Sequence, residues 1–157
     1  MNVELEIHSP EHAYIAGIPD ASIGSISIIN TLEFFDPRRT DAFLTDLRRI
    51  AAPGCALRIA APDLRAAAEA RARGDRAFFD AASDPERPLD LLFADWMYAR
   101  GPGGSRRCNC YDAESLQALL RNFGFACNEI DSANGELRAE LSTPIAEVRV
   151  TELPLTA

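Results

Sequence analysis

Hydrophobic and acidic residues alternate from Val3 to Ile7, which is the period-two pattern of a strand with one face in water. A second run, Ser25 to Ile29, is more uniformly apolar and predicts a strand buried on both faces. A third apolar run extends from Cys55 to Ala61, directly after the helix-breaking pair Pro53-Gly54. The three runs predict neighbouring strands of one β-sheet.

Helical periodicity appears between and after these runs. Thr40 is the expected N-cap of a helix whose apolar residues recur on one face, at Phe43, Leu44, Leu47 and Ile50. A second helical pattern follows Asp63, its expected cap, and breaks near Gly74-Asp75. A third helix is expected from Asp84, followed by a glycine-rich loop at 101–105.

The last third of the chain predicts a helix and a hairpin. Asp112 is the expected cap of a helix that Gly124 ends. Strands are expected over Phe125–Ile130 and Glu136–Leu141, joined by the hairpin signal Asn134-Gly135, with a final strand over 145–153. Strands that alternate with helices predict a single α/β domain over 1–157: a mostly parallel sheet, a C-terminal antiparallel hairpin and helices on both faces.

The charge balance narrows the function classes. The 157 residues hold 24 acidic and 16 basic side chains, a net charge of −8, which disfavours a nucleic-acid partner. All 16 basic residues are arginines, so a lysine Schiff base and the lysine of a phosphate-binding P-loop are excluded. The middle of the chain carries most of the arginines, which leaves binding of an anionic small molecule as an option.

The sequence predicts neither a membrane-spanning segment nor a metal site. The chain contains no apolar run of the roughly 18 residues that span a bilayer, and its first residues lack a signal-peptide pattern. We therefore expect a cytoplasmic protein without a membrane partner, whose four cysteines are reduced. Neither Cys108-Asn109-Cys110 nor the match to H-x-x-E-H at His8–His12 has the remaining ligands of a zinc site, so no metal is expected.

An ordered set of short motifs carries a family resemblance. Ser25 to Phe35 is followed by the segment Leu47–Ile59, which contains Arg48-Arg49-Ile50 and Pro53-Gly54, and then by Ala61-Pro62-Asp63-Leu64. Tyr111-Asp112-Ala113-Glu114-Ser115-Leu116 and Gly124-Phe125 come later. This series resembles the class I S-adenosylmethionine-dependent methyltransferases, in particular the bacterial small-molecule and saccharide group of the methyltransferase type 11 kind. The resemblance covers roughly residues 18 to 130 and implies an incomplete Rossmann-like methyltransferase sheet.

The resemblance also exposes departures from the family. Family members hold the cofactor with a glycine-rich turn after the first strand and an acid at the end of the second, and this chain has no G-x-G before Ser25. The resemblance therefore implies that the first two strand–helix units are absent, and Asn30 and Phe34 stand where the family turn has histidines. We expect no cofactor bound by this chain alone, and S-adenosylmethionine only if a partner completes the site.

Candidate site residues follow from the ends of the predicted strands. Asn30, Leu32 and Glu33 are candidates for a cofactor-facing cleft, and Asp63 and Tyr111 for substrate binding, because sheets of this type bind ligands beyond their carboxyl ends. No residue is assigned a catalytic role. Turn and helix-cap roles are the competing interpretation for Glu33 and Asp63.

Three functions remain open at this point. The first is a degenerate methyltransferase-like protein that is a non-catalytic partner or structural subunit. The second is an active methyltransferase on a small molecule or saccharide whose cofactor pocket another chain completes, and the third is a small-molecule binding module. A truncated sheet also leaves an unpaired edge, so we expect either Val3–Ile7 to pair there or a protein partner or homodimer to do so.

Overall fold

The computed structural model describes residues 3–8, 15–79 and 107–145. These residues form one five-stranded sheet and the helices around it, in the chain order β1 (Glu4–Ile7), β2 (Ile23–Ile29), the 3₁₀ helix η1 (Leu32–Phe34), α1 (Pro37–Ile50), β3 (Ala51–Pro62), α2 (Leu64–Arg73), the 3₁₀ helix η2 (Ala77–Phe79), α4 (Ala113–Asn122), β4 (Ala126–Ala133) and β5 (Glu136–Ser142). The helix expected after Asp84, the loop at 101–105 and nearly all of the strand expected at 145–153 lie outside the described residues.

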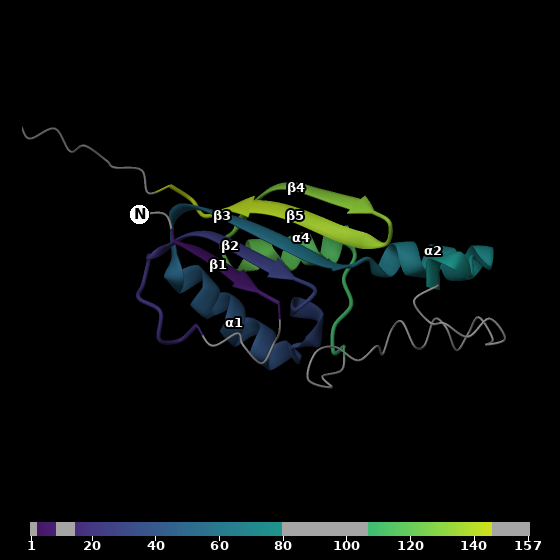
Figure 1. Cartoon of the computed structure of the whole chain (residues 1–157), viewed down its shortest axis with the longest axis horizontal. Helices are drawn as coiled ribbons and strands as arrows, with labels where there is room; N and C mark the ends of the chain where they lie inside the picture. The colour runs from purple at the N-terminus through teal and green to yellow at the C-terminus, as the bar shows by residue number, and fades with distance from the viewer. Residues whose placement is uncertain (1–2, 9–14, 80–106, 146–157) are drawn as a thin grey trace, which may run out of the picture.

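The strands lie in the order β1-β2-β3-β5-β4 (Figure 1). β1, β2 and β3 run parallel, and β5 and β4 continue the sheet as an antiparallel hairpin. The expected architecture, a parallel sheet with a C-terminal antiparallel hairpin, is confirmed. β1 occupies the place beside β2, which is the first of the two pairings expected for that edge.

The turn between β4 and β5 forms as its sequence predicts. Asn134 and Gly135 have φ angles of 53° and 78°, so both residues adopt the left-handed conformation that a tight two-residue hairpin turn requires. Gly135 has a second reason to be glycine: a Cβ at this position would lie 2.7 Å from the Phe78 ring. The turn is therefore held against η2 by close packing.

Two expected boundaries are wrong. The N-cap of α1 is Asp36 rather than Thr40: its carboxylate accepts the backbone N–H of Arg39 at 3.0 Å, and Pro37 occupies the first helical position. Thr40 instead lies buried within the helix, where its hydroxyl donates to the Asp36 carbonyl at 3.0 Å. Asp36 directly precedes Pro37, whose fixed φ suits the first helical position.

The second wrong boundary lies at Pro53-Gly54. β3 begins at Ala51 and passes through both residues, although they were expected to end the helix before a strand starting at Cys55. The pairing of β3 with β2 shifts register there, between Ile23↔Ala51 and Ser25↔Ala56. Gly54 has a φ of 75°, so the pair produces an irregularity inside the strand rather than a boundary.

The core lies on one face of the sheet. Residues paired across four strands share this face and are buried: Ile7, Ile26, Ile28, Leu57, Ile59, Leu137, Ala139 and Leu141. Buried side chains of α1 and of α4, such as Leu47 and Leu120, belong to the same core. The buried side chains of α1 and α4 therefore cover this face of the sheet.

The opposite face of the sheet is polar. Arg58 of the central strand β3 has 71% of its side chain exposed and lies 3.8 Å from Glu140, which is 65% exposed. In β2 the residues on this side, Ser25, Ser27 and Ile29, are half-buried, so the expectation that Ser25–Ile29 is buried on both faces is wrong. Alternating buried and exposed residues in a central strand are typical of a sheet with one face in water.

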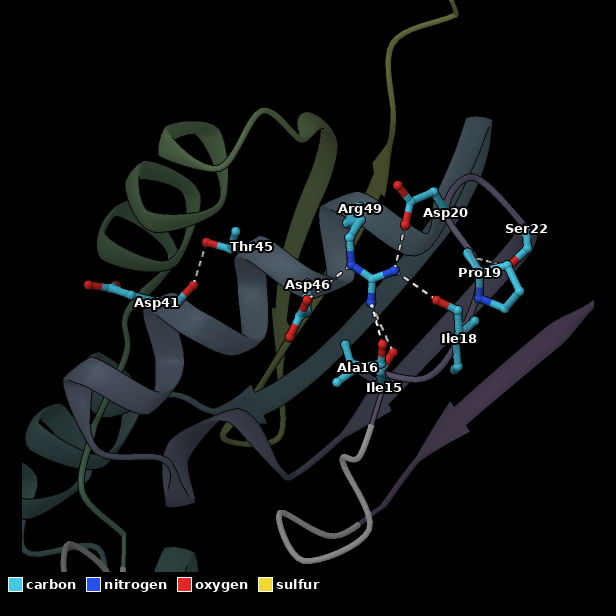
Figure 2. A network of polar contacts seen from close by, with 10 residues as sticks. All are labelled: Ile15, Ala16, Ile18, Pro19, Asp20, Ser22, Asp41, Thr45, Asp46 and Arg49. Atoms are coloured by element: carbon cyan, nitrogen blue, oxygen red, sulfur yellow. Dashed lines mark hydrogen bonds and ion pairs between the residues drawn. The ribbon is translucent and has the colours of Figure 1, made fainter.

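Arg49, in the last turn of α1, ties the connection between β1 and β2 to the helix. Its guanidinium donates to the carbonyls of Ile15 at 3.1 Å, Ala16 at 3.3 Å and Ile18 at 2.7 Å (Figure 2). It also contacts Asp20 at 2.7 Å and Asp46 at 3.1 Å. One planar side chain thus satisfies three carbonyls that no strand or helix pairs.

We predict that Arg49→Ala lowers the midpoint of thermal unfolding by about 5 °C, because three backbone carbonyls lose charge-assisted donors. Arg38→Ala is the matched control, since Arg38 lies exposed in the first turn of the same helix. Differential scanning calorimetry of both variants measures the difference. Equal midpoints for the two variants would show that the guanidinium contributes nothing to holding this connection.

Candidate functional site

A cavity of about 540 Å³ lies at the end of the sheet where β1, β2 and β3 finish. Its polar lining consists of His8, Asn30, Glu33, Arg107, Asn134 and Glu136. Ile29, Phe34, Pro62 and Gly135 complete the wall. The carboxyl ends of three parallel strands and the β4–β5 turn therefore meet around one cavity, at the place where the sequence predicts a cleft.

The segment that follows β2 carries two of the predicted residues into this cavity. Asn30 has a φ of 45°, a left-handed conformation that asparagine tolerates better than most residues, and its backbone N–H donates to the Ala60 carbonyl at 2.9 Å. The chain then enters η1, where the Glu33 carbonyl accepts the backbone N–H groups of Cys108 at 2.7 Å and Asn109 at 3.0 Å. This pairing fixes the segment before α4 against the end of β2.

The Glu33 carboxyl group is buried without a partner. The residue is 1% exposed, and neither carboxylate oxygen has a hydrogen-bond donor among the described residues. Burial raises the pKa of Glu33 from 4.5 to about 7, while the backbone N–H of Glu33 itself and the nearby Arg107 guanidinium oppose this shift and Glu136 adds to it. Burial in turn lowers the pKa of Arg107. Near neutral pH the cavity thus holds a carboxyl group that exchanges its proton easily.

The other predicted residues lie elsewhere. Leu32 is fully buried in the core, next to Glu33 in the chain but not in the lining of the cavity. Asp63 is the N-cap of α2, as expected: its carboxylate accepts the N–H groups of Arg65 at 2.9 Å and Ala66 at 3.3 Å, and it makes a short contact with the Ser132 hydroxyl. Its side chain is thus engaged in holding α2 against β4.

Tyr111 is also part of the structural framework. It is 7% exposed, it forms a bridge with Asp63, and its carbonyl accepts the Leu64 N–H at 2.8 Å. Burial raises the pKa of its phenol above the ordinary value. Beside it, the Asn109 amide donates to the Phe35 carbonyl at 2.6 Å and to the Thr40 hydroxyl at 3.3 Å. The structure therefore brings Asn30 and Glu33 together at one cavity, and places Leu32, Asp63 and Tyr111 outside its lining.

Four polar cavity residues were not singled out as site residues from the sequence, and one of them, Asn134, lies in the predicted hairpin turn. Arg107 follows residues 80–106, which lie outside the described part of the chain. Glu136 begins β5, and His8 follows β1. His8 and Glu136 had a usable signal, because each adjoins the end of a strand that the sequence predicts. Arg107 had none, since its position depends on how the segment before α4 returns to η1.

Metal and membrane features complete the description. In residues 3–8, 15–79 and 107–145, no three histidine, cysteine or acidic side chains come together as a metal site. None of the helices in the described part of the chain is long and apolar enough to cross a lipid bilayer.

Comparison with known proteins identifies the fold. No protein-family model matches the chain, and no curated protein matches it. Among solved structures it is similar to a SAM-dependent methyltransferase from Methanosarcina mazei, with a TM-score of 0.55 and 13% identity over 85% of this chain and 65% of that one. It is also similar to the Burkholderia thailandensis 1,6-didemethyltoxoflavin-N1-methyltransferase, with a TM-score of 0.53 and 12% identity over 84% and 48%.

These similarities establish a class I methyltransferase fold of the Rossmann-like kind and nothing finer, because the identities are low. The chain spans about half to two thirds of the length of the methyltransferases it matches. A cyclase, SpnF, is similar to the same degree, with a TM-score of 0.50 and 13% identity over 85% of this chain and 54% of that one. The same architecture therefore occurs in proteins with different named activities.

The described residues do not fit S-adenosylmethionine. The class I methyltransferases that the sequence resembles bind this cofactor through a glycine-rich turn after the first strand. In this chain β1 is followed by His8-Ser9-Pro10. Gly135 is the one glycine in the cavity lining. The Phe78 ring occupies the space where its Cβ would lie, so this glycine leaves no open space for a ligand. No acid at the end of a strand beside β1 is available for ribose hydroxyls, because β2 ends in Ile29-Asn30.

We predict that Glu33→Gln removes a pH dependence of stability. The folded state holds this proton up to about pH 7 and the unfolded state only to about pH 4.5, so the free energy of unfolding falls between these values by about 3 kcal/mol. Glutamine cannot ionise, so the variant should lack this fall and gain stability over the wild type as pH rises. Urea unfolding at about pH 5 and about pH 8 measures the difference.

Glu129→Gln is the control for this experiment, since Glu129 lies exposed on β4. It should keep the wild-type pH dependence. A parallel pH dependence in Glu33→Gln and the wild type would mean that the Glu33 carboxyl is solvated in solution.

Proposed function

We propose that the chain is a degenerate methyltransferase-like protein that acts as a non-catalytic partner in a protein complex. The observation that carries the proposal is the direct pairing of β1 with β2, joined by residues 8–22, a segment with a single glycine. A complete strand–helix–strand unit needs roughly 30 residues, so this connection has no room for the units that carry the family's cofactor-binding residues.

The polar face of the sheet supports the same proposal. In a complete doubly wound fold, helices cover both faces and the central strands are apolar on both sides. Here the central strand β3 presents Arg58 on the face opposite α1 and α4, with most of its side chain in contact with solvent. Among the described residues no apolar helix layer covers Arg58, and an exposed arginine in a central strand suits a sheet face of that kind.

The outer edge of β1 supports a role in assembly. The Val3 carbonyl accepts the backbone N–H groups of Gly24 at 3.0 Å and Ser25 at 3.3 Å. Because a parallel strand bonds one neighbour through every second residue, the backbone groups of Glu4 and Glu6 point away from β2. Among the described residues no strand pairs with them, so this edge is the surface through which we propose that a second chain joins the sheet.

A second candidate is an active methyltransferase whose cofactor pocket another chain completes. It shares the docking edge with the first proposal and differs in whether S-adenosylmethionine enters the assembled cleft. Binding measurements on the isolated chain and on its complex distinguish the two.

We predict that isothermal titration of the purified chain with S-adenosylmethionine gives no saturable binding at micromolar concentration, since the residues that grip the cofactor are missing. S-adenosylhomocysteine should behave identically, because it shares the adenosyl and amino-acid groups. Micromolar binding by the isolated chain would overturn the degenerate assignment. Binding only after a partner chain is added would favour the completed enzyme over the non-catalytic partner.

We predict that the chain assembles through the β1 edge and that Glu6→Pro abolishes assembly. Proline removes an outward N–H group without removing a bond to β2, so β1 should remain in its own sheet. Light scattering after gel filtration should give twice the monomer mass or more for the wild type and the monomer mass for Glu6→Pro. Glu6→Thr keeps the N–H group and should assemble like the wild type.

A wild-type protein that is monomeric over a wide concentration range would contradict self-association and leave only a different partner chain. Such a chain would be sought by affinity capture with Glu6→Pro as the comparison bait. A partner retained equally by both baits would contradict docking at this edge.

A further inference from the structure

The cavity at the end of the sheet contains an unsatisfied acceptor group. Both oxygens of Glu33 are buried and have no donor among the described residues. Buried carboxyl oxygens normally accept hydrogen bonds, and leaving them without partners costs stability. A native group of this kind at a cavity wall calls for a donor that the described residues do not supply, and a carboxylate offers two parallel acceptor positions.

The charged residues of the lining indicate whether a ligand that supplies this donor is a cation or an anion. Glu33 and Glu136 line the cavity together with one guanidinium, that of Arg107. The Arg138 guanidinium, outside the lining, donates to Glu136 at 2.9 Å, so Glu33 is the lining carboxyl group that receives no hydrogen bond from a described side chain. A cationic ligand would neutralise the Glu33 carboxylate, whereas an anion drawn to Arg107 would also face Glu33 and Glu136.

The volume of the cavity and its other lining residues indicate the size and polarity of the rest of the ligand. A volume of about 540 Å³ lies within the range of small-molecule sites. Ile29, Phe34 and Pro62 give one part of the wall an apolar character, while the amides of Asn30 and Asn134 add neutral hydrogen-bonding groups. The lining thus suits a compact molecule with an apolar body and one charged, hydrogen-bonding end.

We propose that this cavity binds a small organic cation of the amidine or guanidine class, with the Glu33 carboxylate accepting two adjacent N–H groups of the ligand. Planar amidinium and guanidinium groups present their N–H groups in parallel, which matches the two oxygens of one carboxylate. Glu136, whose carboxylate accepts a hydrogen bond from Arg138, lies in the same lining. The proposal goes beyond the non-catalytic partner role, since binding of such a ligand needs neither S-adenosylmethionine nor a second chain.

The electrostatics of the surroundings make the binding depend on pH. The groups near Glu33 are Arg107, Cys110 and Tyr111 from the segment before α4, Glu136 from β5 and His8 after β1. A bound cation stabilises the ionised carboxylate, so binding releases a proton below about pH 7. Affinity should therefore rise as the pH is raised from about 6 to about 8.

The test uses benzamidine as the probe and benzamide, its neutral analogue of similar shape, as the matched ligand. Isothermal titration at about pH 8 should show saturable benzamidine binding by the wild type, with benzamide at least about 10-fold weaker. Glu33→Gln should weaken benzamidine by about 10-fold or more, and Glu129→Gln should bind like the wild type. Thermal unfolding of each variant confirms that it is folded during the titration.

Several outcomes would overturn the proposal. These are the absence of saturable benzamidine binding, equal affinity for benzamidine and benzamide, or undiminished binding by a folded Glu33→Gln variant. Affinity that does not change between about pH 6 and about pH 8 would exclude Glu33 as the group that accepts the ligand. None of these results bears on the titration with S-adenosylmethionine, so this proposal and the proposed function can fail separately.

Discussion

The structure depends on burying one apolar face of a five-stranded sheet. Every strand from β1 to β5 contributes side chains to this face, and α1 and α4 supply the layer that covers it. Because strand side chains alternate between faces, the same pairing register that buries Leu57 and Ile59 places Arg58 between them on the opposite side. A one-residue slip of β3 would bury an arginine and expose two core residues, so the register and the one-sided architecture specify each other.

The cavity is a consequence of how this layer ends. β1, β2 and β3 finish at one side of the sheet, and the chain after β2 turns through Asn30 into η1. Cys108 and Asn109 then bind the Glu33 carbonyl, which draws the segment before α4 over the end of β2. The Glu33 side chain becomes buried because its backbone is pinned from both sides, although its carboxyl group gains no partner within the described chain.

Local sequence signals predicted most of the fold because they act over a few residues. Asp63 and Asp112 cap their helices and Asn134-Gly135 forms its turn, since each depends on backbone groups close in the chain. The errors at Thr40 and Pro53-Gly54 arose where two local signals competed and packing decided between them. The one-sided sheet was signalled by Arg58 within β3, but that signal has meaning only when the strand is known to be central.

The residues of the candidate site were likewise predicted only in part. The sequence placed Asn30 and Glu33 at the correct end of the sheet, because strand ends and parallel connectivity define that edge. It did not predict that Arg107 and Glu136 would join them, since these residues arrive from segments distant in the chain, nor that Asp63 and Tyr111 would be engaged in binding to one another. Long-range packing decides which polar groups face a cavity and which become part of the framework.

The loss of a cofactor cradle and the retention of a cavity are compatible because they depend on different parts of the fold. The cradle of the resembled family belongs to the connection after the first strand, which here is reduced to residues 8–22. The cavity is formed by the ends of β2 and β3 and by the hairpin turn, all of which the core requires for its own packing. Under the proposed function, the protein therefore keeps a lined cavity without binding S-adenosylmethionine on its own. The ligand proposed for that cavity is selected by the Glu33 carboxyl group rather than by the reaction of the proteins that this chain resembles in fold.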